Sequence, residues 1–474
     1  MKKYLLAGML LAGTMQIAKA QDSTGLSLKE CIELALKNNI DVKQSGLLAD
    51  RDEVNWNQAR ANVLPSLNGS AGFGWNQGRT IDPFTNTYIN QQLSSSNLGL
   101  SSNVVLFSGL QLHNAIRQTA FAMQASKMDF EQSKNTLTLN VLLTYLQILN
   151  GEDLLAVAKN QIETTRKQVE RMQILVREGA VGEYQLTDLK GQLAAEEIGI
   201  INSNNTLQTT KLMLCQLLNI PMNKDLKLER DQIASPNALY DNSAEQVYQS
   251  SLQDFAAIKA TDLRVKSFEK SVKVAKGGYF PTLSFGANIG SNYSSAARTS
   301  IPGTVFEANT GQYVKVNNVQ YDVFRQDQNF TFKKISYADQ IDNNLGKSYG
   351  FSLRVPIFNN FFVRNQVKLA NIGLKNAQLQ NESIKLNLRQ NIETAHANMA
   401  NNFDRYKILI GQVADFEVSF HSAEIRFNNG VINSTEYLLV KNNLDRAKAN
   451  LITAGYEYLL RTKILDFYQG KLTF

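Results

Sequence analysis

The fold is decided by the stretch "NVLPSLNGSAGFGW", residues 62–75, because its side chains alternate between two kinds. One side of an extended chain would carry Leu67, Ala71, Phe73 and Trp75. The other side would carry only Ser66, Asn68, Ser70, Gly72 and Gly74. A period of two predicts a β-strand with one apolar face. The pattern returns 216 residues later as "GYFPTLSFGANIGS", residues 278–291, so the chain uses this strand twice.

A duplication of the whole chain explains the second strand, and such repeats define an architecture. We expect a first repeat at residues 21–220, a linker at 221–242 and a second repeat at 243–474. The second repeat has a longer loop, roughly Ser291 to Lys347, rich in Asn, Ser, Gly and Tyr. At a shift of 216, Ser27 matches Ser243 and Pro65 matches Pro281. At a shift of 251, residues 98–107 match 349–358 and Gly179 matches Gly430.

Four strands are predicted, at about residues 66–76, 97–107, 282–291 and 348–358. Each alternates apolar with small or polar side chains over about ten residues, the length that crosses a bilayer as a tilted strand. The apolar faces would meet lipid and the small polar faces a wet lumen. Pro356 is awkward inside the fourth strand, because it has no N–H to donate to the sheet.

Between each strand pair and each glycine lies a long segment without proline and with apolar residues every seven positions. A sustained heptad repeat predicts helices wound as coiled coils. Hairpin turns are expected at Gly179 and Gly430, and the first long helix would extend ~100 Å. The alternative is a set of core stripes in a compact bundle. The first-repeat heptad residues are Ile116, Met123, Phe130 and Leu137, then Val141, Ile148, Leu155, Ile162, Val169 and Val176.

Four strands cannot close into a membrane barrel, because the smallest such barrels have about eight. An open sheet edge in lipid leaves backbone groups unpaired. The chain is therefore expected to share a barrel with copies of itself, since two copies supply eight strands and three supply twelve. The alternative is two hairpins packed on a soluble helical body.

Composition narrows the class of protein further. Residues 1–20 form a basic, then apolar, then small-residue segment typical of a secretory signal peptide, cut before Gln21. No later stretch approaches the ~20 apolar residues of a membrane helix. The formal charge of +7 is mild and interleaved, which argues against a nucleic-acid surface. Cys31 and Cys215 are the only cysteines; their pairing stays open, and the unpaired state is favoured.

The chemistry of an enzyme is missing from the sequence. Neither a phosphate-binding glycine loop nor a nucleophile motif is present. The three histidines, His113, His396 and His421, have no partners at metal-ligand spacing. We therefore expect no enzyme activity, no cofactor and no metal site.

The duplicated order resembles the TolC-like outer-membrane efflux proteins. The residues that carry the resemblance are "VLPSL" and "YFPTL" before the strands, "VVLFSG" and "VPIFNN" after them, and the turns at Gly179 and Gly430. The resemblance implies a mostly α fold with membrane β: a homotrimer with a twelve-stranded barrel in the Gram-negative outer membrane and a periplasmic α-barrel. It also implies two partners, a periplasmic adaptor protein and an inner-membrane pump, and a passive duct for small molecules.

The resemblance further implies two sets of site residues. Pore-facing carboxylates would follow the turns: Glu436 matches one of them, but Leu439 stands where a second is expected, and Gln185 and Asp188 hold the equivalent first-repeat places. Glu436 has an alternative role as an ordinary solvated carboxylate at a helix start. The adaptor would dock on the hairpin tips, at Gly179, Ala180, Val181, Gly430, Val431 and Ile432.

Two other functions stay open. Within the same fold, a duct for type I protein secretion would have the same sequence features. From a different class, a periplasmic coiled-coil scaffold or adaptor without a pore would bind partners through its helices, but it would not need four strands of lipid-crossing length.

Overall fold

The computed structural model describes residues 25–81, 86–90, 92–230 and 238–471. The expected signal peptide at residues 1–20 lies outside this range, as does part of the expected linker. The chain divides into two compact units. One is helical, comprising residues 25–51, 124–263 and 378–471 without the gap at 231–237; the other, residues 52–123 and 264–377 without its gaps, holds the strands.

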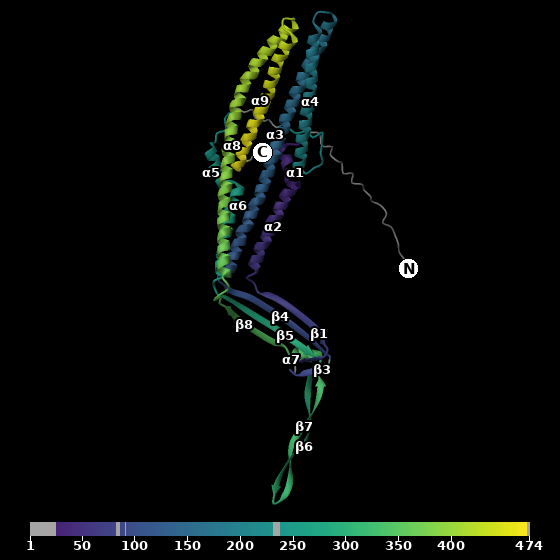
Figure 1. Ribbon diagram of the computed structural model, residues 1–474, viewed down its shortest axis with the longest axis vertical. Coiled ribbons are helices and arrows are strands. Elements are labelled where there is room, and N and C mark those ends of the chain that lie inside the picture. The colour runs from purple at the N-terminus through teal and green to yellow at the C-terminus, as the bar shows by residue number, and fades with distance from the viewer. Residues whose placement is uncertain (1–24, 82–85, 91, 231–237, 472–474) are drawn as a thin grey trace, which may run out of the picture. The chain divides into compact units, whose positions relative to one another are not determined.

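The helices come in matched pairs, one member from each half of the chain (Figure 1). The lengths are 11 residues for α1 and α5, 22 for α2 and α6, and 67 for α3 and α8, while α4 has 36 and α9 has 35. The bounds are α1 Leu28–Asn38, α2 Ile40–Ala61, α3 Gln111–Arg177, α4 Glu183–Leu218, α5 Ala244–Asp254, α6 Ala256–Gly277, α8 Phe362–Asn428 and α9 Ser434–Tyr468.

Identical caps begin α1 and α5. The Ser27 hydroxyl accepts the backbone N–H of Glu30, whose carboxylate accepts the N–H of Ser27. Ser243 and Gln246 form the same capping box. A cap supplies partners for N–H groups that the first turn leaves unbonded. The serines that match at a shift of 216 therefore start equivalent helices.

The heptad residues form the core of the helical unit. All ten predicted positions of α3 are buried or half-buried. Leu137, Val141 and Ile148 pack with α1 and α4 in one cluster, and Leu388, Ile392 and Met399 of α8 pack with α5 and α9 in another. By length and composition α3 contains a stretch able to cross a membrane, which the sequence reading missed. Of that stretch 39% is buried inside the single chain.

The strands form one antiparallel four-stranded sheet in the order β1-β4-β5-β8. Its members are β1 Ser66–Asn76, β4 Leu93–Ser108, β5 Thr282–Ser294 and β8 Gly346–Arg354. The register separates two faces. One row across the sheet is Asn68, Ser101, Asn288 and Ser348, whereas another is Val104, Phe285 and Phe351. The predicted alternation is therefore real, with one polar and one apolar face.

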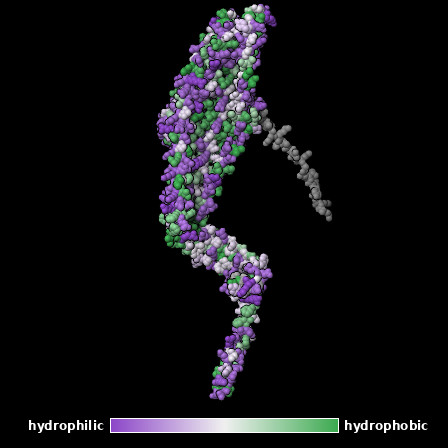
Figure 2. All heavy atoms as spheres, viewed as in Figure 1, coloured by the Kyte–Doolittle hydropathy of each residue, from purple (hydrophilic) through white to green (hydrophobic). Residues whose placement is uncertain are grey.

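The apolar face has no cover over most of its length in a single chain. Phe73, Trp75, Phe351 and Leu353 are each more than half exposed. Figure 2 shows weakly polar and apolar residues gathered over the sheet, whereas the helices carry mostly hydrophilic side chains. Such a large exposed apolar area marks a surface that meets lipid or another protein.

Two details of the strand prediction are wrong. The fourth strand ends at Arg354 rather than near residue 358, because Pro356 cannot donate to the ladder. The connections between the four predicted strands also contain strands that were not predicted: β2 Arg79–Ile81, β3 Tyr88–Asn90, β6 Arg298–Val316 and β7 Val319–Lys334.

The supposed long loop of the second repeat is mainly a β-hairpin. β6 and β7 pair with each other around Asn317 and Asn318, both with positive φ, as a two-residue hairpin turn requires. A short helix, α7 Tyr337–Asn343, then leads back to β8. The segment was predicted as a loop because it is rich in turn-forming residues. Its strands are stabilised by pairing with each other, which composition does not indicate.

Candidate functional site: hairpin tips and a buried charge cluster

Both hairpin turns have the same hydrogen-bonded geometry. The N–H of Gly179 donates to the carbonyl of Val176 at 3.0 Å, and that of Ala180 donates to Leu175 at 2.9 Å. In the second hairpin Gly430 donates to Phe427 at 3.1 Å and Val431 to Arg426 at 2.8 Å. Both glycines have φ of 71°. This is the Schellman ending of a helix, which favours glycine in the left-handed conformation.

We expect Gly430→Ala to loosen this turn. A side chain at Gly430 would touch nothing, so the cost is conformational, about 1–2 kcal/mol. Amide hydrogen exchange at the tip should then reveal opening that is roughly 5–30 times more frequent. Gly411→Ala is the matched control, because Gly411 lies inside α8 with equally open surroundings. There alanine should stabilise by about 0.5–1 kcal/mol; the same loosening at both positions would contradict the turn argument.

The tips of the two hairpins share one core, here called the tip core. It joins Val169 and Met172 of α3, Leu186 and Leu189 of α4, Ala423 and Phe427 of α8, and Ile432 and Tyr437 of the second turn and α9. Ile432 is only 7% exposed, whereas Val431 is 66% exposed. Of the six tip residues predicted for docking, Ile432 is thus a packing residue, whereas Val431 and Ala180 are exposed apolar side chains.

The predicted constriction residues lie at the starts of α4 and α9. Asp188 accepts a hydrogen bond from the Ser434 hydroxyl at 2.9 Å, so the structure joins the two helix starts there. The Glu436 carboxylate lies 3.5 Å from the Arg426 guanidinium and is half exposed, while its backbone N–H is capped by Asn433. The Gln185 side chain donates to the neighbouring Tyr184 hydroxyl at 3.3 Å. Leu439 is exposed.

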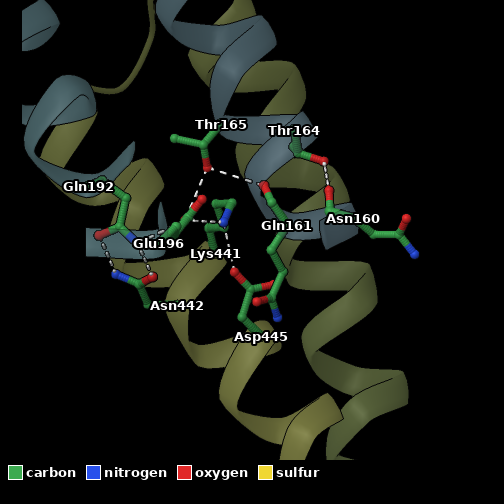
Figure 3. Close-up of polar contacts among 9 residues, drawn as sticks. All are labelled: Asn160, Gln161, Thr164, Thr165, Gln192, Glu196, Lys441, Asn442 and Asp445. Atoms are coloured by element: carbon green, nitrogen blue, oxygen red, sulfur yellow. Dashed lines mark hydrogen bonds and ion pairs between the residues drawn. The ribbon is translucent and has the colours of Figure 1, made fainter. Parts of the chain in front are cut away.

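A charge cluster is formed by the buried Lys441 and the largely buried carboxylates of Glu196 and Asp445 (Figure 3). Lys441 lies one helical turn after Tyr437 of the tip core. The Lys441 ammonium donates to Glu196 at 2.8 Å and to Asp445 at 2.7 Å, and its side chain is 2% exposed. The same oxygen of Glu196 accepts from Thr165 of α3 and from Gln192 of α4. The cluster therefore ties α3, α4 and α9 together with charge-assisted hydrogen bonds.

Sequence reading missed this cluster, although a signal was present. Lys441 follows the heptad residue Tyr437 by four positions, a place that in a coiled coil belongs to the apolar seam. A lone lysine there needs a buried partner. Lys211 of α4 is a second case, buried with its ammonium 3.2 Å from Glu152 and donating to the carbonyl of Leu226.

The charge cluster predicts a pH dependence. Burial raises the pKa of Asp445 above its usual 3.8, and Glu196 adds to this, although Lys441 acts in the opposite direction. Because the pKa is higher in the folded than in the unfolded state, the protonated Asp445 stabilises the fold below about pH 3.8. This contribution is lost as the pH rises through the pKa of Asp445 in the folded state. The stability of the wild type relative to Asp445→Asn should therefore fall from acid toward neutral pH. Thermal unfolding across that range measures it, and a constant or opposite difference would contradict the assignment.

Both cysteines are free and buried in the cluster that joins α1, α3 and α4. Burial raises the pKa of the Cys31 thiol to about 12, helped by Glu30 and Cys215. In the part of the chain that the structure describes, no group of three or more His, Cys, Asp or Glu side chains could hold a metal ion.

The family model described as outer membrane efflux protein matches residues 31–219 and 333–470. The matched residues run from α1 through both long hairpins, and they include the four helices of the tip core. The chain belongs to the outer membrane efflux protein family. Its location in the Gram-negative outer membrane, predicted from the sequence, is confirmed by this membership. Members of the family are channels.

Individual relatives agree with the family. Outer membrane protein TolC of Escherichia coli (strain K12) is 24% identical over 97% of this chain and 85% of its own length. Toxin and drug export protein A of Aggregatibacter actinomycetemcomitans is 23% identical over 66% of this chain and 67% of its own. The crystal structure of CusC shares the fold, with a TM-score of 0.76 at 15% identity over 95% of both chains. The predicted mostly α fold with additional β-strands and the TolC-like resemblance are thereby confirmed.

Proposed function

We propose that this efflux family protein is the passive outer-membrane duct of a tripartite efflux system, exporting small molecules from a periplasmic adaptor and an inner-membrane pump. The observation that carries the proposal is the sheet. It has one apolar and one polar face, and each of its edge strands, β1 and β8, is paired on one side only among the described residues. In lipid such edges must pair, so further copies of the chain are needed to close the barrel.

The helices supply a second argument for a ring of copies. α6 lies between two helices of its own chain: Ser267 donates to the carbonyl of Gln118 in α3, and Phe268 packs on Gly373 in α8. Its duplicate α2 packs on α3, where Gly46 lies against Phe130. Elsewhere on its surface α2 exposes apolar side chains, including Leu47 and Val54. By the internal symmetry, the place beside that surface belongs to α8 of the next copy.

The surfaces for that contact are present in the chain. α2 carries Ile40, Leu47 and Val54, spaced by seven and each more than half exposed. α8 carries Ile372, Leu379 and Leu386 with the same spacing and similar exposure. Unpaired heptad stripes of this kind are typical of coiled-coil partners. We name them the α2 stripe and the α8 stripe, and propose that they form the seam between copies.

Three copies would supply twelve strands in the four-stranded sheets and a helical tunnel beneath them. The deciding measurement is the mass of the detergent-solubilised particle from the outer-membrane fraction, by light scattering corrected for detergent. A mass of three chains supports the duct. A monomer in the soluble periplasmic fraction would leave the sheets unclosed and would favour a periplasmic scaffold or adaptor without a pore.

Glu436 is the residue for which we expect a direct effect on conduction. If its carboxylate lines the closed end of the tunnel, Glu436→Gln should weaken block of the channel by divalent cations, roughly tenfold for a contribution of about 1.4 kcal/mol. Single-channel recording in planar bilayers measures the block. Glu424→Gln is a control with the same charge change on α8. Unchanged block in Glu436→Gln would remove Glu436 from the pore lining.

Protein secretion is the second candidate for the same duct. The name of one relative, Toxin and drug export protein A, includes the export of a toxin as well as that of drugs. A deletion strain separates the two functions: accumulation of small toxic compounds supports efflux, whereas loss of a secreted protein from the medium, with normal drug tolerance, supports secretion.

A further inference from the structure

The inference concerns the outer end of the sheet, which is the end remote from the helices. All four strands join their helices at one end: β1 follows α2, β4 precedes α3, β5 follows α6 and β8 precedes α8. The opposite end carries the β2–β3 and β6–α7 connections. In the proposed barrel this second end faces the cell exterior, so the inference rests on the proposed function.

The short helix α7 lies on the apolar face of the sheet at this end. The Ser291 hydroxyl donates to the carbonyl of Ile341 at 2.6 Å, and the hydroxyls of Ser96 and Tyr337 are 3.0 Å apart. The rings of Tyr293 and Tyr337 are 4.9 Å apart. In the sheet register, Ser96 and Tyr293 share a row with Phe73, which belongs to the apolar face. The helix is therefore on the side that would meet lipid, not the lumen.

The base of the β6–β7 hairpin is fixed at the same place. The Gln340 side chain accepts the N–H of Ser294 at 2.9 Å and donates to the carbonyl of Ile335 at 3.0 Å. The N–H of Ile335 donates to Ala297 at 3.3 Å. Gln340 and Ala297 are fully or almost fully buried. These bonds hold the first and last residues of the hairpin against the outer end of β5.

Three cations lie at this base, and a fourth lies on β8 toward the same end of the sheet. Arg298 is directly opposite Lys334 in the strand register, and Lys333 is opposite Thr299. Like charges opposite each other destabilise a strand pair unless an anion lies between them. Lys347 of β8 shares its row with Ile289 and Leu100, so it is on the apolar face. We call these four residues the rim cluster; all are exposed.

The nearby carboxylates do not neutralise the rim cluster. α7 carries Asp339 and Asp342, but Asp339 is occupied by the Ser336 hydroxyl at 2.6 Å, where it caps the helix. Within the ranges that the structure describes, no ion pair involves any member of the rim cluster. Four cations thus outnumber the two carboxylates of α7, and one of the four, Lys347, lies on the face of the sheet that would meet lipid.

We propose that the rim cluster binds the phosphate groups of anionic lipid in the outer leaflet. A phosphate can bridge the opposed Arg298 and Lys334, and Lys347 can extend from the apolar face to the same headgroup level. Tyr337 and Leu345, both nearly half exposed beside the cluster, supply apolar contact at the membrane interface. The cluster anchors the outer rim, and with it the long hairpin, to the membrane surface.

The experiment compares the wild type with the variant R298Q/K333Q/K334Q/K347Q by native mass spectrometry of the purified full-length protein. The probes are a bis-phosphorylated glycolipid and phosphatidylcholine, each added in detergent, with inorganic phosphate as competitor. Each basic residue near a membrane surface contributes about fivefold, so the variant should bind the glycolipid several hundredfold more weakly. The matched control K159Q/K167Q/K190Q/K224Q removes the same charge from exposed helical-unit positions and should bind as the wild type does.

Three results would overturn the proposal. The first is equal glycolipid binding by the rim variant and the wild type, or binding of phosphatidylcholine by the wild type that is as strong as its binding of the glycolipid. The second is complete displacement by millimolar inorganic phosphate, which would indicate a site for a free anion. The third is a change in the number of chains per assembly in the rim variant. That result would show that the rim cluster is a contact between protein chains. The same spectra report the assembly mass, so a monomer would refute the duct separately from the lipid site.

Discussion

Leu379→Glu is expected to abolish assembly of the channel while leaving the single chain folded. Leu379 is the central residue of the α8 stripe, and its side chain is 64% exposed in one chain. A glutamate there costs an isolated chain almost nothing, because surface substitutions usually stay within ±0.5 kcal/mol. In the proposed ring it would place one unpaired carboxylate in the apolar seam of every copy, at a cost of several kcal/mol each.

The assembly is measured by light scattering of the outer-membrane extract, and folding by circular dichroism. Gln380→Glu is the matched control: it adds the same charge at the next residue, which is also exposed and lies about 100° around the helix. We expect a trimer for Gln380→Glu and a helical but unassembled chain for Leu379→Glu. Normal assembly of Leu379→Glu would show that the α8 stripe faces solvent. If Leu47→Glu in the α2 stripe prevents assembly equally, the α2 stripe is identified as the partner surface of the α8 stripe.

Lys441→Ala is expected to produce the largest loss of stability in the helical unit. The substitution leaves two carboxylates, 12% exposed at Glu196 and 20% exposed at Asp445, without the cation that both contact. Removing one partner of a buried ion pair typically costs 3–5 kcal/mol, because the remaining charge has lost its solvent and its partner. The cluster joins α3, α4 and α9, so the loss should appear as separation of the hairpins near the tip, measured by amide hydrogen exchange in these helices.

Lys448→Ala provides the control on the same helix. Lys448 also forms an ion pair, with Glu417 at 2.8 Å, but both side chains are well exposed. Such surface pairs contribute about 0–1 kcal/mol. The variant E196Q/K441M/D445N removes all three charges and should recover much of the stability lost in Lys441→Ala. A loss of equal size at Lys448 and Lys441, or no recovery in the uncharged variant, would contradict the role of buried charge.

The sequence predicted the features that repeat at short range. Alternation over ten residues specified which side chains share a face of β1 and β5, and the register bears this out row by row. Heptad spacing specified the buried positions of α3 and α8, and a glycine between two such segments specified the turns at Gly179 and Gly430. Each of these signals depends on neighbours within a few residues, so it can be read from one chain.

The same local signals did not extend to every site residue. Ile432 was predicted as a docking residue but is buried, because its surroundings come from α3 and α4 of the other hairpin. The β6–β7 hairpin was taken for a loop, because strand pairing, not composition, stabilises it. The pore-lining role of Glu436, Asp188 and Gln185 stays a prediction.

The sequence by itself determined the duplicated order of elements, the faces of the strands and the heptad cores, since backbone geometry imposes periods of 2 and 3.6 residues on any chain. Only the tertiary structure decided that Lys441 meets Glu196 across 245 positions, that α7 covers the apolar face beside Ser291, and that α2 and α8 each keep an exposed apolar stripe. These contacts join residues far apart in the chain, and their energies depend on which helices lie together, a choice that no local period encodes.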